Sequence, residues 1–191
     1  MTSAKSVNLS GYTDAVIREL QHTLRQVSDE SAGQLVERIL QAQKVFVAGA
    51  GRSGLMMKAF AMRLMHLGLQ VYVVGETVTP GLGRDDLLII GSGSGETKSL
   101  AGMAAKARSL GASVASVTVN PKSTIGQLSE TVIELRAAVK DSSNPEKTTI
   151  QPMGSLFEQS LLLVLDSIIL SIMERKGTDG STMFGQHANL E

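Results

Sequence analysis

Residues 89–97, IIGSGSGET, decide the fold of this chain. They come directly after the apolar residues Leu87 and Leu88, and a helical pattern begins at Lys98. An apolar strand that stops in three glycines, two serines and a threonine before a helix is typical of an anion site. Glycines let backbone N–H groups turn inward, Ser and Thr supply hydroxyl groups, and the next helix points its positive end at the loop.

A second loop of similar composition, GAGRSG at residues 49–54, follows the predominantly apolar run KVFVA at residues 44–48. Each loop stands between a run that predicts a strand and a pattern that predicts a helix. In open α/β sheets, ligands bind at the carboxyl ends of the strands. The two loops together predict a phosphorylated ligand at that edge of a sheet.

Apolar runs and helical patterns alternate along the rest of the chain. The runs predict strands at residues 44–48, 70–74, 86–90, 113–119 and 131–135. The helical patterns predict helices at residues 12–27, from a cap at 28–31 to residue 40, at 53–67, at 98–110 and at 156–175. We expect a turn or short helix at 121–128, a loop at 142–152 and a polar tail without periodicity at 177–191.

This alternation predicts an α/β fold: a doubly wound, flavodoxin-like sheet of five parallel strands with helices on both faces. Ser53 and the 92–97 loop should lie at the carboxyl ends of adjacent strands. We expect a single domain over residues 1–191, with N-terminal helices at 10–42, the core sheet at about 44–135, a C-terminal helix at 155–176 and the tail after it.

Composition excludes several function classes. With 42% hydrophobic and 19% charged residues, the chain is typical of a soluble globular protein. Its 18 basic and 18 acidic residues balance, so no bulk field attracts nucleic acid or a membrane. The chain contains no cysteine, which excludes disulfides, a thiolate nucleophile and a cysteine-ligated metal.

The most apolar long stretch is residues 156–173. It contains Glu158 and Asp166, which favours a buried helix over a membrane span. The first ten residues lack the basic and then apolar pattern of a signal peptide. These features predict a cytoplasmic protein.

The glycines Gly49, Gly51 and Gly54 also fit the dinucleotide-binding pattern G-x-G-x-x-G, and Glu76 lies near the expected place of its ribose-binding acid. A nicotinamide or flavin protein is therefore an alternative. Against it stand the second, hydroxyl-rich loop, the cation of Arg52 inside the first loop, and a chain that is short for two domains.

Together the two loops resemble the SIS (sugar isomerase) domain family, which binds phosphosugars. Its motifs match GAGRSG with Ser53, and SGSGET at residues 92–97. The likeness to an isomerase branch of that family is carried by four more segments: RLMHLG at 63–68, VYVVGET at 71–77, PMGSLFE at 152–158 and HANLE at 187–191.

The resemblance implies interconversion of D-arabino-hex-3-ulose 6-phosphate and fructose 6-phosphate through a cis-enediol, in the ribulose monophosphate pathway of formaldehyde fixation. It also implies a homotetramer, a dimer of dimers, without a metal or organic cofactor. Two alternatives within the family stay open. One is an isomerase of arabinose or heptose phosphates. The other is a regulatory phosphosugar-binding protein, although such proteins usually carry a DNA-binding domain for which this chain has no room.

Hydroxyl and cationic side chains of the loops are the candidate phosphate and sugar ligands. They are Ser53, Ser92, Ser94 and Thr97, with Gly51, Gly93 and Arg52 beside them. Each hydroxyl could also cap a helix or turn, and Thr97 before Lys98 is a plausible N-cap. The two roles can coexist, because a helix N-terminus with spare donors is itself an anion site, and we favour the ligand role. Glu76 and Thr77, at the end of the second predicted strand, are candidates for contacts to sugar hydroxyls, or else form a polar turn.

Glu158 is the candidate general base, because moving a carbonyl along a sugar requires a group that takes a proton from carbon. The sequence offers another explanation: Ser155 to Glu158 has the spacing of a capping box, which would place Glu158 in a purely structural role. The residues alone favour the capping role, and the family resemblance favours catalysis.

The three histidines differ in their surroundings. His22 is predicted to lie on the surface, and His66, at a helix end, to be a structural or subunit-contact residue. His187 lies in the aperiodic tail, where no packing pattern explains it. We expect it to reach an active site, that of a neighbouring subunit. The helix at 156–173 is apolar around most of its circumference, which predicts that it or the N-terminal helices bury against a partner.

Overall fold

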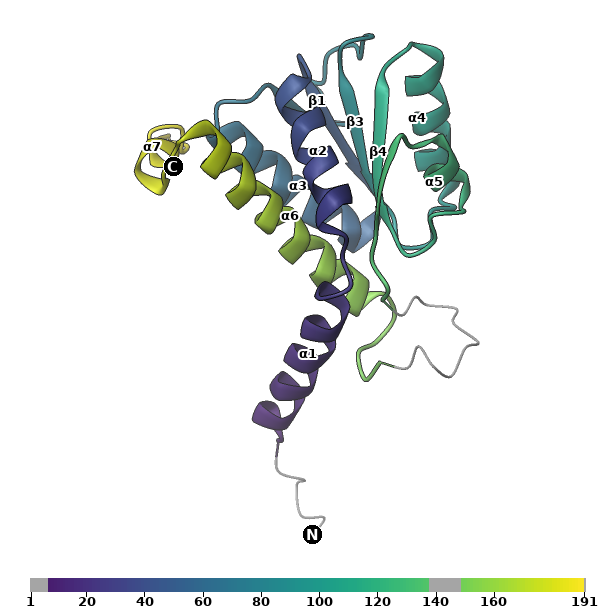
Figure 1. Cartoon of the computed structure of the whole chain (residues 1–191), viewed down its shortest axis with the longest axis vertical. Coiled ribbons are helices and arrows are strands. Elements are labelled where there is room, and N and C mark those ends of the chain that lie inside the picture. Colours follow the sequence, from purple (N-terminus) through teal and green to yellow (C-terminus); the bar gives the residue numbers. More distant parts are fainter. Residues whose placement is uncertain (1–6, 138–148, 191) are drawn as a thin grey trace.

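Five parallel strands form one sheet in this computed structural model, which describes residues 7–137 and 149–190 (Figure 1). The strand order is β2-β1-β3-β4-β5. The predicted α/β fold and its parallel sheet are confirmed, and β1 and β3, which precede the two glycine-rich loops, are neighbours. The strand bounds are β1 Val45–Gly49, β2 Val71–Val73, β3 Leu87–Gly91, β4 Ser113–Thr118 and β5 Thr131–Glu134.

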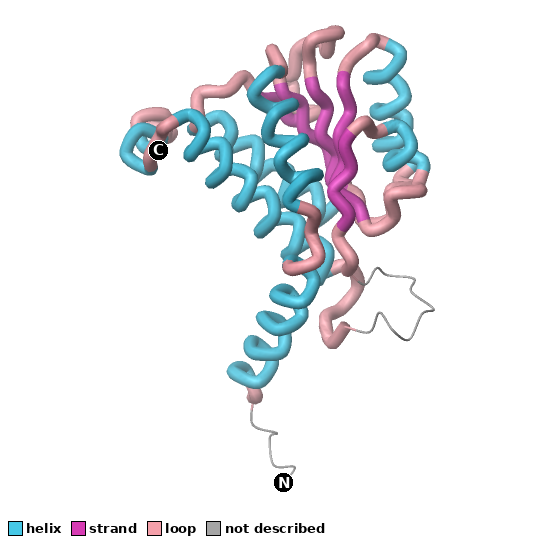
Figure 2. Tube along the Cα trace, in the orientation of Figure 1, coloured by secondary structure: helices cyan, strands magenta, loops and turns pink. Residues whose placement is uncertain are grey.

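Helices cover both faces of the sheet (Figure 2). The alternation of side chains along β1 explains why: Val45 and Val47 face one core, whereas Phe46 and Ala48 face the other. The first core is closed by α2 (Asp29–Gln41), α3 (Gly51–His66) and α6 (Ser155–Lys176), and the second by α4 (Lys98–Ser109) and α5 (Thr124–Leu128). Both faces of the central strands are therefore buried.

The remaining helices lie at the periphery. Helix α1 (Leu9–Leu24) packs on α6 and extends away from the sheet, and α7 (Gly180–Phe184) lies at the far end of α6 (Figure 1). The predicted cap of α2 is confirmed, since the Ser28 side chain accepts the N–H of Ser31. By length and composition α6 could cross a membrane, but half of its most apolar window is buried, which is typical of a core helix.

Two details of the prediction change. The tail is not without structure, because the Asp179 side chain accepts the N–H of Thr182 and starts α7. Strand β2 ends at Val73, since the Thr79 hydroxyl donates to the Val73 carbonyl at 2.6 Å and closes a turn there. Of the predicted 142–152 loop, residues 142–148 lie outside the described residues, as does Glu191 of the tail.

Candidate functional site

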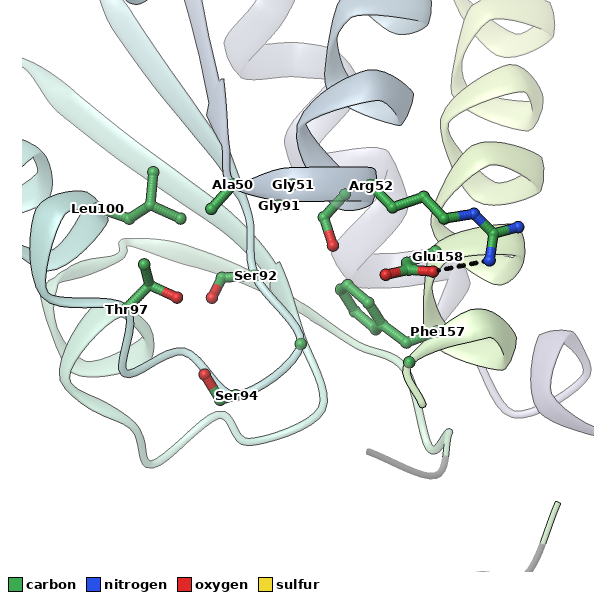
Figure 3. Close-up of a pocket in the computed structure, with 13 residues that line it drawn as sticks. Ala50, Gly51, Arg52, Gly91, Ser92, Ser94, Thr97, Leu100, Phe157 and Glu158 are labelled. Atoms are coloured by element: carbon green, nitrogen blue, oxygen red, sulfur yellow. Dashed lines mark ion pairs between the residues drawn. The ribbon is translucent and has the colours of Figure 1, made fainter. Parts of the chain in front are cut away.

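A cavity of about 430 Å³ opens at the carboxyl ends of β1 and β3, between the first turns of α3, α4 and α6 (Figure 3). Its walls come from both glycine-rich loops and from the start of α6. The lining residues are Ala50, Gly51, Arg52, Ser53, Gly91, Ser92, Gly93, Ser94, Thr97, Leu100, Gly154, Phe157 and Glu158. The structure thus brings together, in one cavity, all the candidate ligands of the two loops and the candidate base.

The side of the cavity formed by α4 is built for an anion. Thr97 is the N-cap residue of α4, but its side chain makes no capping hydrogen bond, so the first-turn N–H groups remain available to a ligand. Ser92 Oγ accepts the N–H of Gly95, and Ser94 Oγ accepts the N–H of Glu96, each at 3.2 Å. Because both serines act as acceptors there, their hydroxyl hydrogens remain free to donate to a phosphate.

Glycine in the first loop permits a close approach of strand and helix. A Cβ atom on Gly49 would lie 2.9 Å from the Cα atom of Gly54, so β1 and α3 could not meet at this distance with larger residues. This packing explains the G-x-G-x-x-G spacing without a dinucleotide. Ser53, in the first turn of α3, faces the cavity.

An ion pair forms the opposite side of the cavity. Arg52 Nη1 lies 3.1 Å from Glu158 Oε2 and also donates to Ser155 Oγ at 2.9 Å. Figure 3 shows this pair on one side and the hydroxyl groups of Ser92, Ser94 and Thr97 on the other, with the Phe157 ring between them.

The capping-box explanation of Glu158 is wrong. The N-cap residue of α6 is Gly154, which has no side chain with which to cap the helix. Ser155 is therefore the first helical residue, and its hydroxyl is engaged by Arg52 instead. The Glu158 side chain, 13% exposed, points to Arg52 and the cavity. In the part of the chain that the structure describes, no group of three His, Cys, Asp or Glu side chains is placed to hold a metal ion.

Sequence reasoning missed the apolar part of the lining, Leu100 and Phe157. Phe157 stands inside the PMGSLFE segment, next to Glu158, and a Cβ atom on Gly93 would come within 3.3 Å of its ring. Gly93 therefore makes room for the ring, which separates the two polar sides of the cavity. The sequence signal that could have found Phe157 is its place beside Glu158 at a helix start. An apolar residue at this place is equally well explained by packing in the core.

Glu76 and Thr77 lie outside the cavity. Both fall in the exposed turn after β2, at the edge of the sheet, and Glu76 pairs with Lys58 at 3.3 Å. Thr77 is exposed in the same turn. Within one chain, neither residue supports the predicted contact to a sugar hydroxyl.

His187 also lies far from this cavity. It follows α6, whose 22 residues at a rise of about 1.5 Å each span about 33 Å. Its ring stacks on His66 with centroids 5.4 Å apart, and on Phe184 at 6.0 Å. His66 is buried, and burial, followed by the charges of Arg63 and His187, lowers its pKa. The expected structural position of His66 agrees with this packing, and His22 is exposed as expected.

A carboxylate on α1 holds the segment that leads into the cavity. Glu19 Oε2 accepts the Thr149 hydroxyl at 2.6 Å and the Gln151 amide at 2.9 Å, and Oε1 accepts the Ile150 N–H at 2.9 Å. A few residues later Met153 adopts a φ of +56°, a left-handed conformation that side chains other than glycine rarely take. The segment that leads into α6 is therefore fixed by hydrogen bonds to Glu19 and contains a residue, Met153, in a strained backbone conformation.

Comparisons with known proteins agree with this geometry. Residues 38–163 match the SIS domain family. A Bacillus subtilis protein named 3-hexulose-6-phosphate isomerase is 54% identical over 94% of this chain and 97% of its own length. A crystal structure from Methanococcus jannaschii, whose authors infer the function of 3-hexulose-6-phosphate isomerase, has 35% identity and a TM-score of 0.83, covering 95% of this chain and 99% of that one.

A more distant structure shares the fold alone. A phosphoheptose isomerase from Francisella tularensis has 14% identity and a TM-score of 0.67, covering 87% of this chain and 96% of that chain. The alternatives of an arabinose or heptose phosphate isomerase and of a dinucleotide-binding protein are not favoured by these comparisons.

Proposed function

The chain belongs to the SIS domain family, and we propose that it is an isomerase that converts 3-hexulose 6-phosphate, D-arabino-hex-3-ulose 6-phosphate, into fructose 6-phosphate and back. The observation that carries the proposal is the 54% identity to a protein of that name over nearly the whole chain. The cavity supports it, because an anion site and a carboxylate face each other across a space of suitable size for a sugar phosphate.

In this proposal the phosphate binds at the start of α4. Ser92, Ser94 and Thr97 donate hydroxyl hydrogen bonds, and the first-turn N–H groups add theirs. Fixing the phosphate fixes the sugar chain, which then extends past the Phe157 ring toward Arg52 and Glu158. Holding the reacting carbon beside the base in this way supplies much of the rate enhancement in reactions of this kind.

Glu158 then moves the proton. Its carboxylate takes the hydrogen from C2 of the sugar, the C–H electrons form the C2–C3 double bond, and the C3 carbonyl oxygen gains a proton to give the cis-enediol. Return of a proton to C3 and loss of the proton from the C2 hydroxyl leave the carbonyl at C2. Arg52 orients the carboxylate and donates to the oxygens as negative charge develops on them, so the proposal requires no metal.

The second proton carrier is proposed to come from another subunit. His187 cannot reach the cavity of its own chain across the length of α6, so a role at the sugar oxygens requires a partner's tail. The described residues offer apolar surface for assembly: Leu9, Tyr12 and Ile17 of α1 and Leu163 and Leu170 of α6 are all exposed. We therefore retain a cytoplasmic homotetramer, a dimer of dimers, as part of the proposal.

The test is a coupled assay with 3-hexulose 6-phosphate, in which fructose 6-phosphate formed by the purified protein is converted onward and read as NADPH. We expect turnover that is unchanged by a chelator, and deuterium from heavy water at C3 of the product, because the proton exchanges at the base. Arabinose 5-phosphate and sedoheptulose 7-phosphate are tested as alternative substrates, with their isomerisation followed directly by NMR because neither yields fructose 6-phosphate. Faster turnover of either one would overturn the substrate assignment, and loss of activity with chelator would overturn the metal-free mechanism.

A further inference from the structure

Glu96 is the single acidic residue of the 92–97 loop. A carboxylate pointing into the cavity would repel a phosphate dianion, yet Glu96 is not part of the lining. Its Oε1 accepts the backbone N–H of Thr124 at 2.9 Å, and its Oε2 accepts the Thr124 hydroxyl at 2.7 Å. Thr124 is the first residue of α5, so both carboxylate oxygens are tied to a neighbouring element.

These two bonds hold the carboxylate in its charged form. The hydroxyl of Thr124 and then its backbone N–H lower the pKa of Glu96 below its usual value. The carboxylate of Glu96 therefore accepts hydrogen bonds from the start of α5 and does not point into the cavity. The arrangement makes Glu96 a strong acceptor at neutral pH.

The rest of the loop is attached to the same segment through its backbone. The Gly93 carbonyl accepts the N–H of Val119 at 3.0 Å, and the Gly95 carbonyl accepts the N–H of Ile125 at 3.1 Å. Gly95 has a φ of +68° and lies directly against Ser123, where any Cβ would clash. The side chains therefore divide: Ser92, Ser94 and Thr97 face the cavity, whereas Glu96 is held on α5.

We infer that Glu96 is a positioning residue for phosphate binding: through its two bonds to Thr124 it fixes the turn that presents Ser94 and Thr97 to the ligand. The backbone transmits the effect directly, because the N–H of Glu96 donates to Ser94 Oγ at 3.2 Å and Thr97 is the next residue. The inference rests on the proposed function for the identity of the ligand.

An electrostatic role and a positioning role of Glu96 predict opposite changes in phosphate binding when its side chain is removed. If Glu96 acted only through its charge, its removal would strengthen binding of a dianion nearby, because a repulsion disappears. If it acts by position, removal lets the turn relax and weakens binding. The sign of the change in KM therefore separates the two explanations.

The experiment compares four variants: Glu96→Ala, Thr124→Val, the double variant, and Thr124→Ser as the conservative control. Steady-state kinetics with fructose 6-phosphate gives KM and kcat, and calorimetric titration with inorganic phosphate gives a binding constant that requires no catalysis. Melting temperatures verify that each variant is folded. Thr124→Val removes the hydroxyl donor but keeps both the backbone N–H and the charge on Glu96.

We expect Glu96→Ala to raise KM and weaken phosphate binding on the order of tenfold, with kcat changed less than about twofold. Thr124→Val should give a smaller rise in KM, Thr124→Ser should resemble the wild type, and the double variant should be no worse than Glu96→Ala, since both act through one contact. An unchanged or lower KM in Glu96→Ala, or additive effects in the double variant, would overturn the inference. If the wild type shows no isomerase activity, the proposed function fails, and the phosphate titration still decides the role of Glu96.

Discussion

Arg52 links two helices whose first turns are far apart in sequence: its Nη1 lies 3.1 Å from Glu158 Oε2 on α6 while also donating to Ser155 Oγ. Residues 52 and 155 are separated by 103 positions. The contact fixes the direction of the Glu158 carboxylate, because a guanidinium group presents its donors in a rigid plane.

Replacing Glu158 by glutamine should reduce kcat by about a hundredfold to ten-thousandfold, the range typical of a lost general base. The amide keeps the size of the side chain and a hydrogen bond to its surroundings, so the melting temperature should change little. Isomerase kinetics and thermal unfolding measured on one preparation check this. Near wild-type turnover in Glu158→Gln would remove Glu158 from the mechanism.

The double replacement of Ser94 and Thr97 by alanine should raise KM for the phosphosugar far more than it lowers kcat. Two hydroxyl donors are lost from the anion site, whereas Glu158 and Arg52 are untouched. Ser109→Ala is a matched control, because the Ser109 hydroxyl donates only to the Lys106 carbonyl at the other end of α4. An unchanged KM in the double variant would mean that the phosphate binds elsewhere.

If His187 acts on a partner's site, two inactive variants should restore activity when mixed. Glu158→Gln supplies an intact tail, and His187→Ala supplies an intact carboxylate. Subunits exchanged at equal amounts should recover about a quarter of wild-type activity, since half of the dimers are mixed and each has one complete site. Mixtures no more active than the separate variants would contradict action between subunits.

The attachment of the C-terminal segment should weaken in mild acid. The pKa of His66 is lowered from its usual value of 6.5 in the folded protein, by burial first. Its contribution to stability is therefore complete above pH 6.5 and is lost as the pH falls through the lower, folded-state pKa. The protection of the amides of residues 180–187, measured relative to their intrinsic exchange rate at each pH, should therefore decrease as the pH falls from 7.5 to 5.5. In His66→Phe this added pH dependence should disappear, and its persistence would assign the effect to another group.

Met153→Gly should leave the protein equally stable or stabilise it by up to about 1 kcal/mol, because glycine takes the left-handed conformation without strain. Met153→Val should destabilise it, since a branched side chain tolerates that conformation least. Chemical unfolding of the two variants beside the wild type measures both effects. Greater stability in the valine variant would show that Met153 is not strained.

The sheet and the anion loop follow from the sequence because their signals are local. A buried parallel strand needs a continuous apolar run, and a phosphate loop needs glycines and hydroxyl residues between that run and a helix, so residues 87–98 contain both. The roles of Ser155 and Glu158 could not be predicted in the same way. Ser155 lies inside α6 rather than at its N-cap, and its hydroxyl and the Glu158 carboxylate both contact Arg52, a residue more than a hundred positions away in the sequence.

Three other differences have similar causes. Glu76 and Thr77 lie outside the cavity because they follow β2, the edge strand beside β1, whereas the cavity is lined by the loops after β1 and β3. Glu96 is not among the predicted site residues, because its role depends on Thr124 of α5, a partner 28 residues away in the sequence. Helix α7 was missed although Asp179 and Thr182 have the spacing of an N-cap, since five residues are too few to show periodicity.

Helix α1 carries both an exposed apolar surface and a carboxylate that contacts the segment before α6. Its outer side bears exposed apolar residues, among them Tyr12 and Ile17, while Glu19 on the same helix holds residues 149–151 just before the strained Met153. A contact on the exposed side of α1 would therefore also help to fix residues 149–151, which lead into the helix that carries Glu158. In the proposed assembly, a partner that packs on α1 would thereby also steady the segment that positions the proposed base.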